Sequence, residues 1–206
     1  MKKIIYLARF FSGLHYSFLN KEWKPDGVPT VYKMIEGLDK SKHKVEFVFS
    51  NYNLNSSSRF IKFYTKLKLD NFRSDFHILS VNSKNNFLRR LLNFFFILKK
   101  FYFIFCLIKK FKPDLVYIDR AHVIEGAIIK KFLKTKVLLR VMGVAVYSYN
   151  SIVSGNSLFS NISRWAFKIN FDHILFSQDG GDIESFKKKY ISKRTNTSTF
   201  LNGVKT

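Results

Sequence analysis

The chain has 206 residues, of which 47% are hydrophobic and 17% aromatic, with 9 Gly and 3 Pro. This length and composition are those of a folded globular protein, and they exclude disordered, low-complexity and collagen-like chains. Lys and Arg number 36 against 14 Asp and Glu, a formal net charge of +22. Such an excess favours anionic partners such as nucleic acid, anionic lipid or phosphorylated substrates, with codon bias toward Lys and Phe as the alternative cause.

The N-terminal part of the chain predicts buried strands joined by a polar loop and by helices. Residues 3–8 form a continuous apolar run, typical of a strand that is buried on both faces of a parallel sheet. A polar loop through Gly13 and Gly27 follows, and from Thr30, the expected N-cap, apolar residues recur with helical spacing. Strands are expected at 44–49 and 76–81, a polar loop at 51–58 and a basic helix at 59–69.

The rest of the chain continues the alternation of strands and helices. The longest helical pattern, 86–112, is stopped by Pro113. Further strands are expected at 115–118, 137–146, 172–177 and 198–201, and further helices at 123–133, 160–170 and 182–190. Strands that alternate with helices predict an α/β fold with a Rossmann-like, doubly wound and mostly parallel sheet.

Several kinds of site and signal are missing from the sequence. One Cys, Cys106, and five scattered His lack metal-ligand spacing, and there is no Walker loop or nucleophile elbow. The apolar run near the N-terminus is too short for a signal peptide, and no uncharged run approaches the roughly 20 residues of a membrane-spanning helix. We therefore expect no metal, and a cytoplasmic, reducing compartment.

Three short stretches occur in an order that is informative when they are taken together. Lys112-Pro113-Asp114 precedes one apolar strand, Asp172-His173 opens another, and Asn202-Gly203-Val204 follows the last. This order resembles the N-terminal domain of the family-4 (group 1) glycosyltransferases, whose fold is GT-B, over nearly the whole chain. The resemblance implies that residues 1–206 are the acceptor-side domain and that the C-terminal donor-binding domain is absent, because only three residues follow Gly203.

The resemblance also implies a function and a set of partners. The enzyme would transfer a hexose from a nucleotide-sugar donor to a glycan or lipid-linked acceptor in surface polysaccharide biosynthesis, with no cofactor beyond the donor. Further expected partners are an anionic membrane surface, at the inner face of the plasma membrane, and a separate chain that carries the C-terminal domain. The alternatives are an inactive fragment or a basic, non-enzymatic module that binds anionic membrane or nucleic acid, although no nucleic-acid recognition motif is present.

The loop after the first strand holds the first candidate binding residues, Gly13 and Gly27. In the family, a glycine-rich loop at this place lets the backbone approach the substrates, and the N-terminus of the following helix suits an anion. Here Asp26-Gly27-Val28-Pro29 replaces the usual glycine pair. A plain turn before a helix is therefore the alternative interpretation.

Arg120 and His122 follow the predicted strand 115–118, and ligands of open α/β sheets bind beyond the carboxyl ends of strands. We expect His122 to orient or deprotonate an acceptor hydroxyl, because the pKa of a histidine lies near neutrality. The alternative is that Asp119 caps the following helix and His122 is solvated.

Arg140 and Gly143 lie at the end of the next predicted strand and are candidate substrate-binding residues. Arg140 is suited to neutralise a phosphate or carboxylate. Many members of the family have a His where this chain has Met142, which cannot act as an acid or base. A core strand that ends at a Gly turn is the alternative. Asn202 is the last candidate, at the turn where the family passes to its second domain.

The predicted helix 86–112 combines pairs of basic residues with many Phe residues. A basic, aromatic helix suits an interface that is rich in anionic lipid. Its apolar residues go nearly all round, however. A helix that packs on the sheet while its Lys side chains reach out to water is therefore the alternative.

Overall fold

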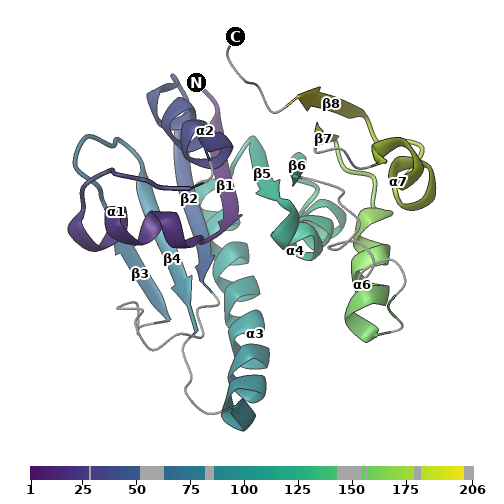
Figure 1. The fold of residues 1–206 in the computed structure, drawn as a ribbon, viewed down its shortest axis with the longest axis horizontal. Coiled ribbons are helices and arrows are strands. Elements are labelled where there is room, and N and C mark those ends of the chain that lie inside the picture. Colours follow the sequence, from purple (N-terminus) through teal and green to yellow (C-terminus); the bar gives the residue numbers. More distant parts are fainter. Residues whose placement is uncertain are drawn as a thin grey trace. The chain divides into compact units, whose positions relative to one another are not determined.

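The computed structural model of the protein describes residues 1–27, 29–51, 63–81, 86–142, 155, 157–178 and 182–201. Side chains are described for these residues apart from 86–93, 120, 178 and 201. The chain forms two compact units, Met1–Asp114 (unit 1) and Leu115–Thr206 (unit 2). Each unit contains strands that are connected by helices (Figure 1).

Unit 1 has a mixed sheet with helices on both faces. Its elements are β1 (Lys3–Arg9), the short 3-10 helix η1 (Ser12–Leu14), α1 (His15–Asn20), α2 (Pro29–Lys40), β2 (Lys44–Asn51), β3 (Tyr64–Leu67), β4 (Asp75–Ser80) and α3 (Asn86–Phe111). β1 pairs with β2 and β2 with β4 in parallel, whereas β3 runs antiparallel to β4. β1, β2 and β4 are almost entirely buried, as their continuous apolarity predicts, and the short, half-exposed β3 suits a sheet edge.

One face of the unit 1 sheet is a layer of aromatic rings. Phe47 of β2 and Phe76 of β4 stack with their ring centroids 4.9 Å apart. Phe18 of α1 lies across them, 5.1 Å from the ring of Phe76 and 5.8 Å from that of Phe49. Burying a Phe side chain contributes about 1.5–3 kcal/mol, so this cluster fixes α1 against the sheet.

The opposite face of this sheet meets α3 through a mixture of rings and polar groups. Phe103 of α3 lies 4.9 Å from the ring of Tyr64 and 5.7 Å from that of His77. His77 shares a 3.0 Å hydrogen bond with the Tyr64 hydroxyl and a 2.9 Å bond with Glu46. These polar groups satisfy one another under the helix, so their burial is compatible with a packed core.

Unit 2 has parallel strands in the order β5-β6-β7-β8. Its elements are β5 (Leu115–Asp119), the 3-10 helix η2 (Arg120–His122), α4 (Val123–Ile128), the π-helix η3 (Ile129–Leu133), β6 (Val137–Met142), α6 (Leu158–Phe167), β7 (His173–Gln178), α7 (Ile183–Tyr190) and β8 (Thr197–Leu201).

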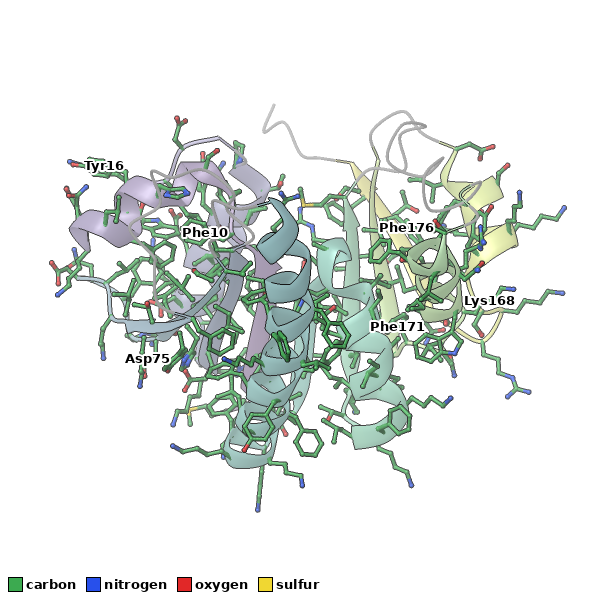
Figure 2. All side chains as sticks on the ribbon, turned by 90° about the horizontal axis from the view of Figure 1, so that it is seen from below. Phe10, Tyr16, Asp75, Lys168, Phe171 and Phe176 are labelled. Carbon is green, nitrogen blue, oxygen red and sulfur yellow. The ribbon has the colours of Figure 1, made fainter. Side chains whose placement is uncertain are left out.

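The helices of unit 2 pack on the strands through close contacts. Gly126 lets α4 approach β5, because a Cβ atom at this position would overlap the side chain of Ile118. Phe186 of α7 contacts the rings of Phe167 and Phe176 at 5.4 and 6.2 Å. Figure 2 shows Phe171 and Phe176 inside unit 2, Phe10 inside unit 1 and Tyr16 at the surface of unit 1, in agreement with their exposure.

The α/β, Rossmann-like class with mostly parallel strands is confirmed, and three local predictions need correction. The basic helix predicted at 59–69 is wrong where the structure describes it, because β3 forms there by pairing with β4. The loop predicted after β1 contains η1 and α1, which Phe18 anchors. Thr30 lies inside α2 and does not cap it, since the helix begins at Pro29. Most of the loop 51–58 and the strand end 143–146 lie outside the described residues.

Candidate functional site

Ligands of open, parallel α/β sheets bind beyond the carboxyl ends of the strands. In unit 1, these ends are Arg9 of β1, Asn51 of β2 and Ser80 of β4. The chain continues from β1 alongside β2, because the N–H of Phe10 donates to the Ser50 carbonyl over 2.9 Å. The carboxyl edge of unit 1 is therefore a defined row of residues that the loop with Gly13 adjoins.

Asp26 forms hydrogen bonds with both Gly13 and Gly27. The Asp26 N–H donates to the Gly13 carbonyl over 2.9 Å, and a Cβ atom at position 13 would overlap the Asp26 carbonyl oxygen. Gly27 has φ of +91°, and its N–H donates to the Asp26 carboxylate over 2.7 Å. Both glycines are thus required by the backbone of this loop. Their role in binding a substrate stays a prediction.

His15 is a residue of this edge that the sequence interpretation missed. Its ring meets that of Phe10 edge-on, with the centroids 4.9 Å apart. Burial lowers the pKa of His15, so its imidazole is the neutral form near pH 7. The available signal was its place directly after a Gly-bearing turn that follows the first strand, but a single His in a polar loop does not stand out.

In unit 2, the carboxyl end of β5 carries an acid–base pair. Nδ1 of His122 donates to Oδ1 of Asp119 over 3.0 Å, and the same oxygen accepts the N–H of Ala121 over 3.1 Å. Only 1% of His122 is exposed, so the alternative of a solvated histidine is wrong. The bond from Ala121 lies in η2, and α4 begins after His122 without a side-chain cap, so Asp119 does not cap α4. The structure describes only the backbone of Arg120. The catalytic role of His122 stays a prediction.

Arg140 of β6 is buried beside the same pair. It lies opposite Asp119 in the register of β5 and β6, and its guanidinium carbon is 5.6 Å from the centroid of the Phe200 ring. Burial raises the pKa of the neighbouring Tyr117 hydroxyl, and the charge of Arg140 opposes that rise. The other predicted binding residues of this region, Gly143 and Asn202, lie outside the described residues.

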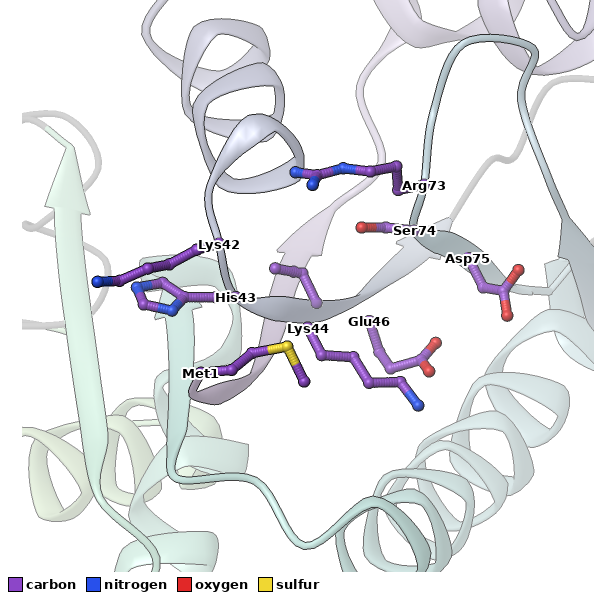
Figure 3. A pocket seen from close by; sticks show the side chains of 9 residues that line it. Met1, Lys42, His43, Lys44, Glu46, Arg73, Ser74 and Asp75 are labelled. Carbon is purple, nitrogen blue, oxygen red and sulfur yellow. The ribbon is translucent and has the colours of Figure 1, made fainter.

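The opposite, amino-terminal edge of unit 1 holds a basic pocket of about 280 Å³ (Figure 3). Lys42, His43, Lys44 and Arg73 line it, together with Glu46 and Asp75. Arg73 donates to the carbonyls of Asp39 and Ser41 at the end of α2. The two carboxylates bond to His77 and Lys66, over 2.9 and 2.7 Å. Three of these six groups, Arg73, Glu46 and Asp75, therefore hold the fold, and the pocket lies at the edge opposite the one where such sheets bind ligands.

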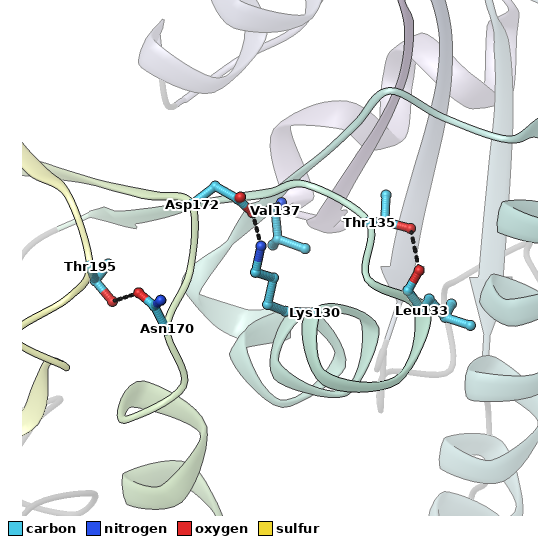
Figure 4. Close-up of polar contacts among 7 residues, drawn as sticks. All are labelled: Lys130, Leu133, Thr135, Val137, Asn170, Asp172 and Thr195. Atoms are coloured by element: carbon cyan, nitrogen blue, oxygen red, sulfur yellow. Dashed lines mark hydrogen bonds and ion pairs between the residues drawn. The ribbon is translucent and has the colours of Figure 1, made fainter.

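The amino-terminal edge of unit 2 is held by Asp172. Its carboxylate accepts from Nζ of Lys130 over 2.7 Å and from the N–H of Val137 over 2.8 Å (Figure 4). Burial raises the pKa of Asp172, but the bonds from Lys130 and Val137 together bring it below its usual value. This contact joins η3, β6 and the start of β7, and is structural.

Two classes of feature are absent from the part of the chain that the structure describes. No group of three or more His, Cys, Asp or Glu residues is arranged to hold a metal ion there. Within the same residues, no helix combines the length and the apolarity that crossing a membrane requires.

Comparison with known proteins identifies the fold. No protein-family model matches the chain, and no curated protein matches its sequence. Sucrose-phosphate synthase from Thermosynechococcus elongatus is similar in structure, with a TM-score of 0.58 and 10% identity, over 99% of this chain and 49% of the synthase. A shorter structure of that synthase has a TM-score of 0.55 and 10% identity, over 98% of this chain and 90% of that one.

UDP-GlcNAc 2-epimerase from Methanocaldococcus jannaschii gives a TM-score of 0.48 with 14% identity, over 98% of this chain and 45% of the epimerase. The chain thus spans about half the length of the epimerase and of the longer synthase structure. The likeness to the synthase shows that the chain has a glycosyltransferase-like fold of the GT-B type.

Proposed function

We propose that this chain is the acceptor-side part of a family-4 glycosyltransferase that transfers a hexose from a nucleotide sugar to a glycan or lipid-linked acceptor in surface polysaccharide biosynthesis. The observation that carries this proposal is the fold, since nearly the whole chain matches about half of an enzyme that makes sucrose phosphate. Fold alone does not define a reaction, so the site and the assay must support it.

The carboxyl edges of the two units supply groups that such a transfer needs. The bond from the anomeric carbon to the diphosphate breaks, the acceptor oxygen bonds to that carbon, and the acceptor proton leaves with the diphosphate. Positive charge stabilises the departing diphosphate, which is the proposed role of Arg140 and Arg120. Gly143 is a further proposed substrate-binding residue. His122 is the proposed group that orients or deprotonates the acceptor, and Gly13, Gly27 and Asn202 are the remaining proposed binding residues.

A genetic and biochemical assay tests the transfer. Extracts of cytosol and membranes from cells that make the protein contain any partner chain, so they are supplied with radiolabelled UDP-, GDP- and dTDP-hexoses. We expect hexose incorporation into glycan or lipid to fall when the gene is deleted and to return when the purified chain is added back. Equal incorporation in the deletion extract from every donor would contradict the proposal.

The rival function, nucleic-acid binding, predicts a different result. A chain of net charge +22 that binds phosphates releases counterions, so its affinity for generic DNA or RNA would fall steeply with salt. A gel shift at two salt concentrations, set against rescue of hexose transfer in the deletion extract, separates the two functions. Rescue of transfer by a chain that gives no salt-sensitive gel shift favours the transferase.

We also propose that the protein contacts an anionic membrane surface, and α6 supports this most directly. Its inward face carries small residues, Ser160, Ser163 and Ala166, together with Phe167. Its large apolar side chains point outward: Leu158, Phe159, Ile162 and Trp165 are exposed, as is Phe132 of η3. This is the reverse of an ordinary surface helix, which buries its apolar stripe.

The charges around this surface fit an anionic lipid. Nζ of Lys131 lies 5.6 Å from the ring centroids of both Phe132 and Trp165, so the two rings flank one cation. α6 itself contains Arg164 and no acidic residue. Aromatic side chains beside basic ones are typical of helices that lie in the membrane interface. α3 adds outward-facing Phe94, Phe95, Ile97, Leu98, Tyr102 and Phe105.

Flotation with vesicles tests the membrane proposal. We expect binding to phosphatidylcholine vesicles that contain phosphatidylglycerol, and much weaker binding to phosphatidylcholine alone. Replacing both Phe159 and Trp165 by Ser should weaken binding about tenfold or more, because each ring contributes roughly 1.5–3 kcal/mol when it leaves water. The pair Phe94→Ser with Phe95→Ser tests separately whether α3 contributes. Equal flotation with neutral and anionic vesicles would contradict a role for charge.

A further inference from the structure

The carboxyl edge of the unit 1 sheet buries two neutral polar groups, the Asn51 amide nitrogen and the Ser80 hydroxyl, that have no partner among the described residues. Asn51 is 4% exposed and Ser80 is 5% exposed. Nδ2 of Asn51 and Oγ of Ser80 are both buried, and neither forms a hydrogen bond with any residue that the structure describes. A buried donor left without a partner costs about 1–3 kcal/mol. Two such groups at one edge therefore point to a partner that the described residues do not supply.

The two groups are neighbours on one face of the sheet. Asn51 and Ser80 are partners in the parallel register of β2 and β4, so their side chains point to the same side. On that side they follow Phe49 and Ile78, which are also register partners and belong to the buried core. The polar pair therefore lies at the end of the aromatic layer of unit 1.

Two aromatic rings continue this row toward β1. Arg9 pairs with Ser50, and the Phe10 N–H bonds to the Ser50 carbonyl, so Phe10 comes next to Asn51 along the edge. The ring of His15 lies against Phe10. His15 is half-buried, so the row runs from a partly open imidazole, over Phe10, to Asn51 and Ser80.

The chemistry of this row selects the class of ligand. A carboxamide and a hydroxyl both donate and accept hydrogen bonds without charge. A phosphate would call for Arg or Lys on this face, and a metal ion would call for carboxylates. Arg9 is paired with Ser50 and so alternates to the opposite face of the sheet. Phe10 and His15 offer apolar ring surface beside the polar pair. An uncharged ring that carries several hydroxyl groups and an apolar face, a pyranose sugar, matches both features.

We propose that Asn51 and Ser80 bind hydroxyl groups of a sugar ring, and that His15 and Phe10 flank this subsite. The proposal rests on the transferase function, for which it identifies a neutral sugar of the acceptor as the group that unit 1 holds. Asn51 donates to one sugar oxygen, and Ser80 donates to or accepts from a second. None of these four residues was selected from the sequence, because a buried strand end shows no motif.

Titration of the full chain with methyl glycosides tests the subsite. The probes are methyl α-glucopyranoside, methyl α-galactopyranoside and methyl α-mannopyranoside, and the signals are the side-chain amide resonances of Asn51 in NMR spectra. We expect at least one glycoside to shift these resonances in a saturable manner. If none shifts them, or if the amide contacts only a buried water that no glycoside displaces, the proposal is overturned.

Substitutions locate the effect. Asn51→Leu and Ser80→Ala should each weaken binding of the glycoside about tenfold, the value of one lost hydrogen bond, as followed by the remaining shifted resonances. Tyr190→Phe is the matched control, because it also removes a buried hydroxyl without a partner among the described residues, on α7 of unit 2. Unchanged affinity in both edge variants, or equal loss in the control, overturns the assignment.

The titration is independent of the transfer assay, since it contains no nucleotide sugar. Glycoside binding that persists when extracts show no transfer would reject the proposed function and keep the subsite. Transfer that proceeds while no glycoside reaches Asn51 would keep the function and reject the subsite. The wild-type titration needs no variant to fold, so the test does not depend on the stability of the substituted chains.

Discussion

The carboxyl edge of unit 2 buries charged groups together with neutral Ser177, whereas the buried polar pair at the edge of unit 1 is neutral. In that pair, Nδ2 of Asn51 and Oγ of Ser80 lack a hydrogen-bond partner among the described residues. The edge of unit 2 has charged Asp119 and Arg140, with His122 bonded to Asp119. An uncompensated buried charge costs several kcal/mol, whereas a neutral group costs about 1–3 kcal/mol. The chain therefore provides partners for its charges and can leave neutral groups for a ligand.

Gly13→Val should lower the free energy of unfolding more than the other substitutions. It places a side chain in the tightly packed loop beside the carboxyl edge of unit 1. The new Cβ would overlap the Asp26 carbonyl, so the loop must move, and we expect a loss of about 2–4 kcal/mol in the free energy of unfolding. Thermal and urea unfolding measure it. Gly37→Ala in α2 is the control, since its Cβ meets no atom within 4 Å, and it should stabilise by about 0.5–1 kcal/mol. Unchanged stability of Gly13→Val would show that the loop is not fixed as described.

His122→Ala tests the edge of unit 2. It removes a buried ring and the bond to Asp119, so we expect a loss of about 1–3 kcal/mol in the free energy of unfolding. The proposed acid–base role predicts in addition a fall of about 100-fold or more in transfer per folded molecule. Full transfer in the folded variant would leave the pair a structural role only. His43→Ala, on the rim of the amino-terminal pocket, should change neither quantity.

Asp172→Asn tests how much the amino-terminal edge of unit 2 contributes to stability, for comparison with the carboxyl edge tested by His122→Ala. The pKa of Asp172 is lower in the folded state than in the unfolded state, where it is about 3.9. The bonds of its carboxylate therefore stabilise the fold fully at pH values above the unfolded-state pKa. This stabilisation is lost as the pH falls through the folded-state pKa. At neutral pH we expect a loss of about 1 kcal/mol, since the pair is partly exposed.

Acid titration of stability checks this prediction. The wild-type protein should lose more stability on acidification than Asp172→Asn does. Asp70→Asn, at an exposed site, serves as the control. Equal acid sensitivity of the wild type and Asp172→Asn would mean that the bonds from Lys130 and Val137 contribute nothing measurable.

Ser177→Ala should have the smallest effect on stability. Its Oγ is the neutral counterpart in unit 2, buried at the end of β7 with no partner among the described residues. Removing an unpaired buried hydroxyl is expected to change the free energy of unfolding by no more than about 0.5 kcal/mol, in the stabilising direction. A clear loss of stability would reveal a partner for this hydroxyl and weaken the distinction between neutral and charged groups.

The sequence predicted the fold well because its strands are continuous apolar runs separated by helical patterns. It failed at 64–67, within the predicted helix 59–69, where pairing with β4 makes a strand out of a segment whose charge pattern resembles a helix. It also failed at α1, whose single anchor, Phe18, gives no periodicity. Such contacts depend on residues distant in the chain, which local patterns do not contain.

The candidate site was predictable only in part. Gly13 and His122 follow strands, and Arg140 lies near the end of β6. Their residue types have recognised roles in binding or catalysis, so position and type together selected them. Asn51 was assigned to a polar loop and Ser80 to a strand interior, and neither type is unusual there. They became candidate binding residues because the structure buries their polar atoms without a partner among the described residues. This burial depends on the pairing of β2 with β4, which the sequence does not reveal.

Transfer kinetics with the acceptor and the donor varied separately test the central claim most directly. The assay compares the wild-type chain, Asn51→Leu combined with Ser80→Ala, and Tyr190→Phe, each in the deletion extract. We predict that the double variant raises the KM for the acceptor about tenfold or more and leaves the KM for the nucleotide sugar unchanged, while Tyr190→Phe alters neither. A rise in the donor KM alone, or the absence of hexose transfer by the wild-type chain, would contradict the account.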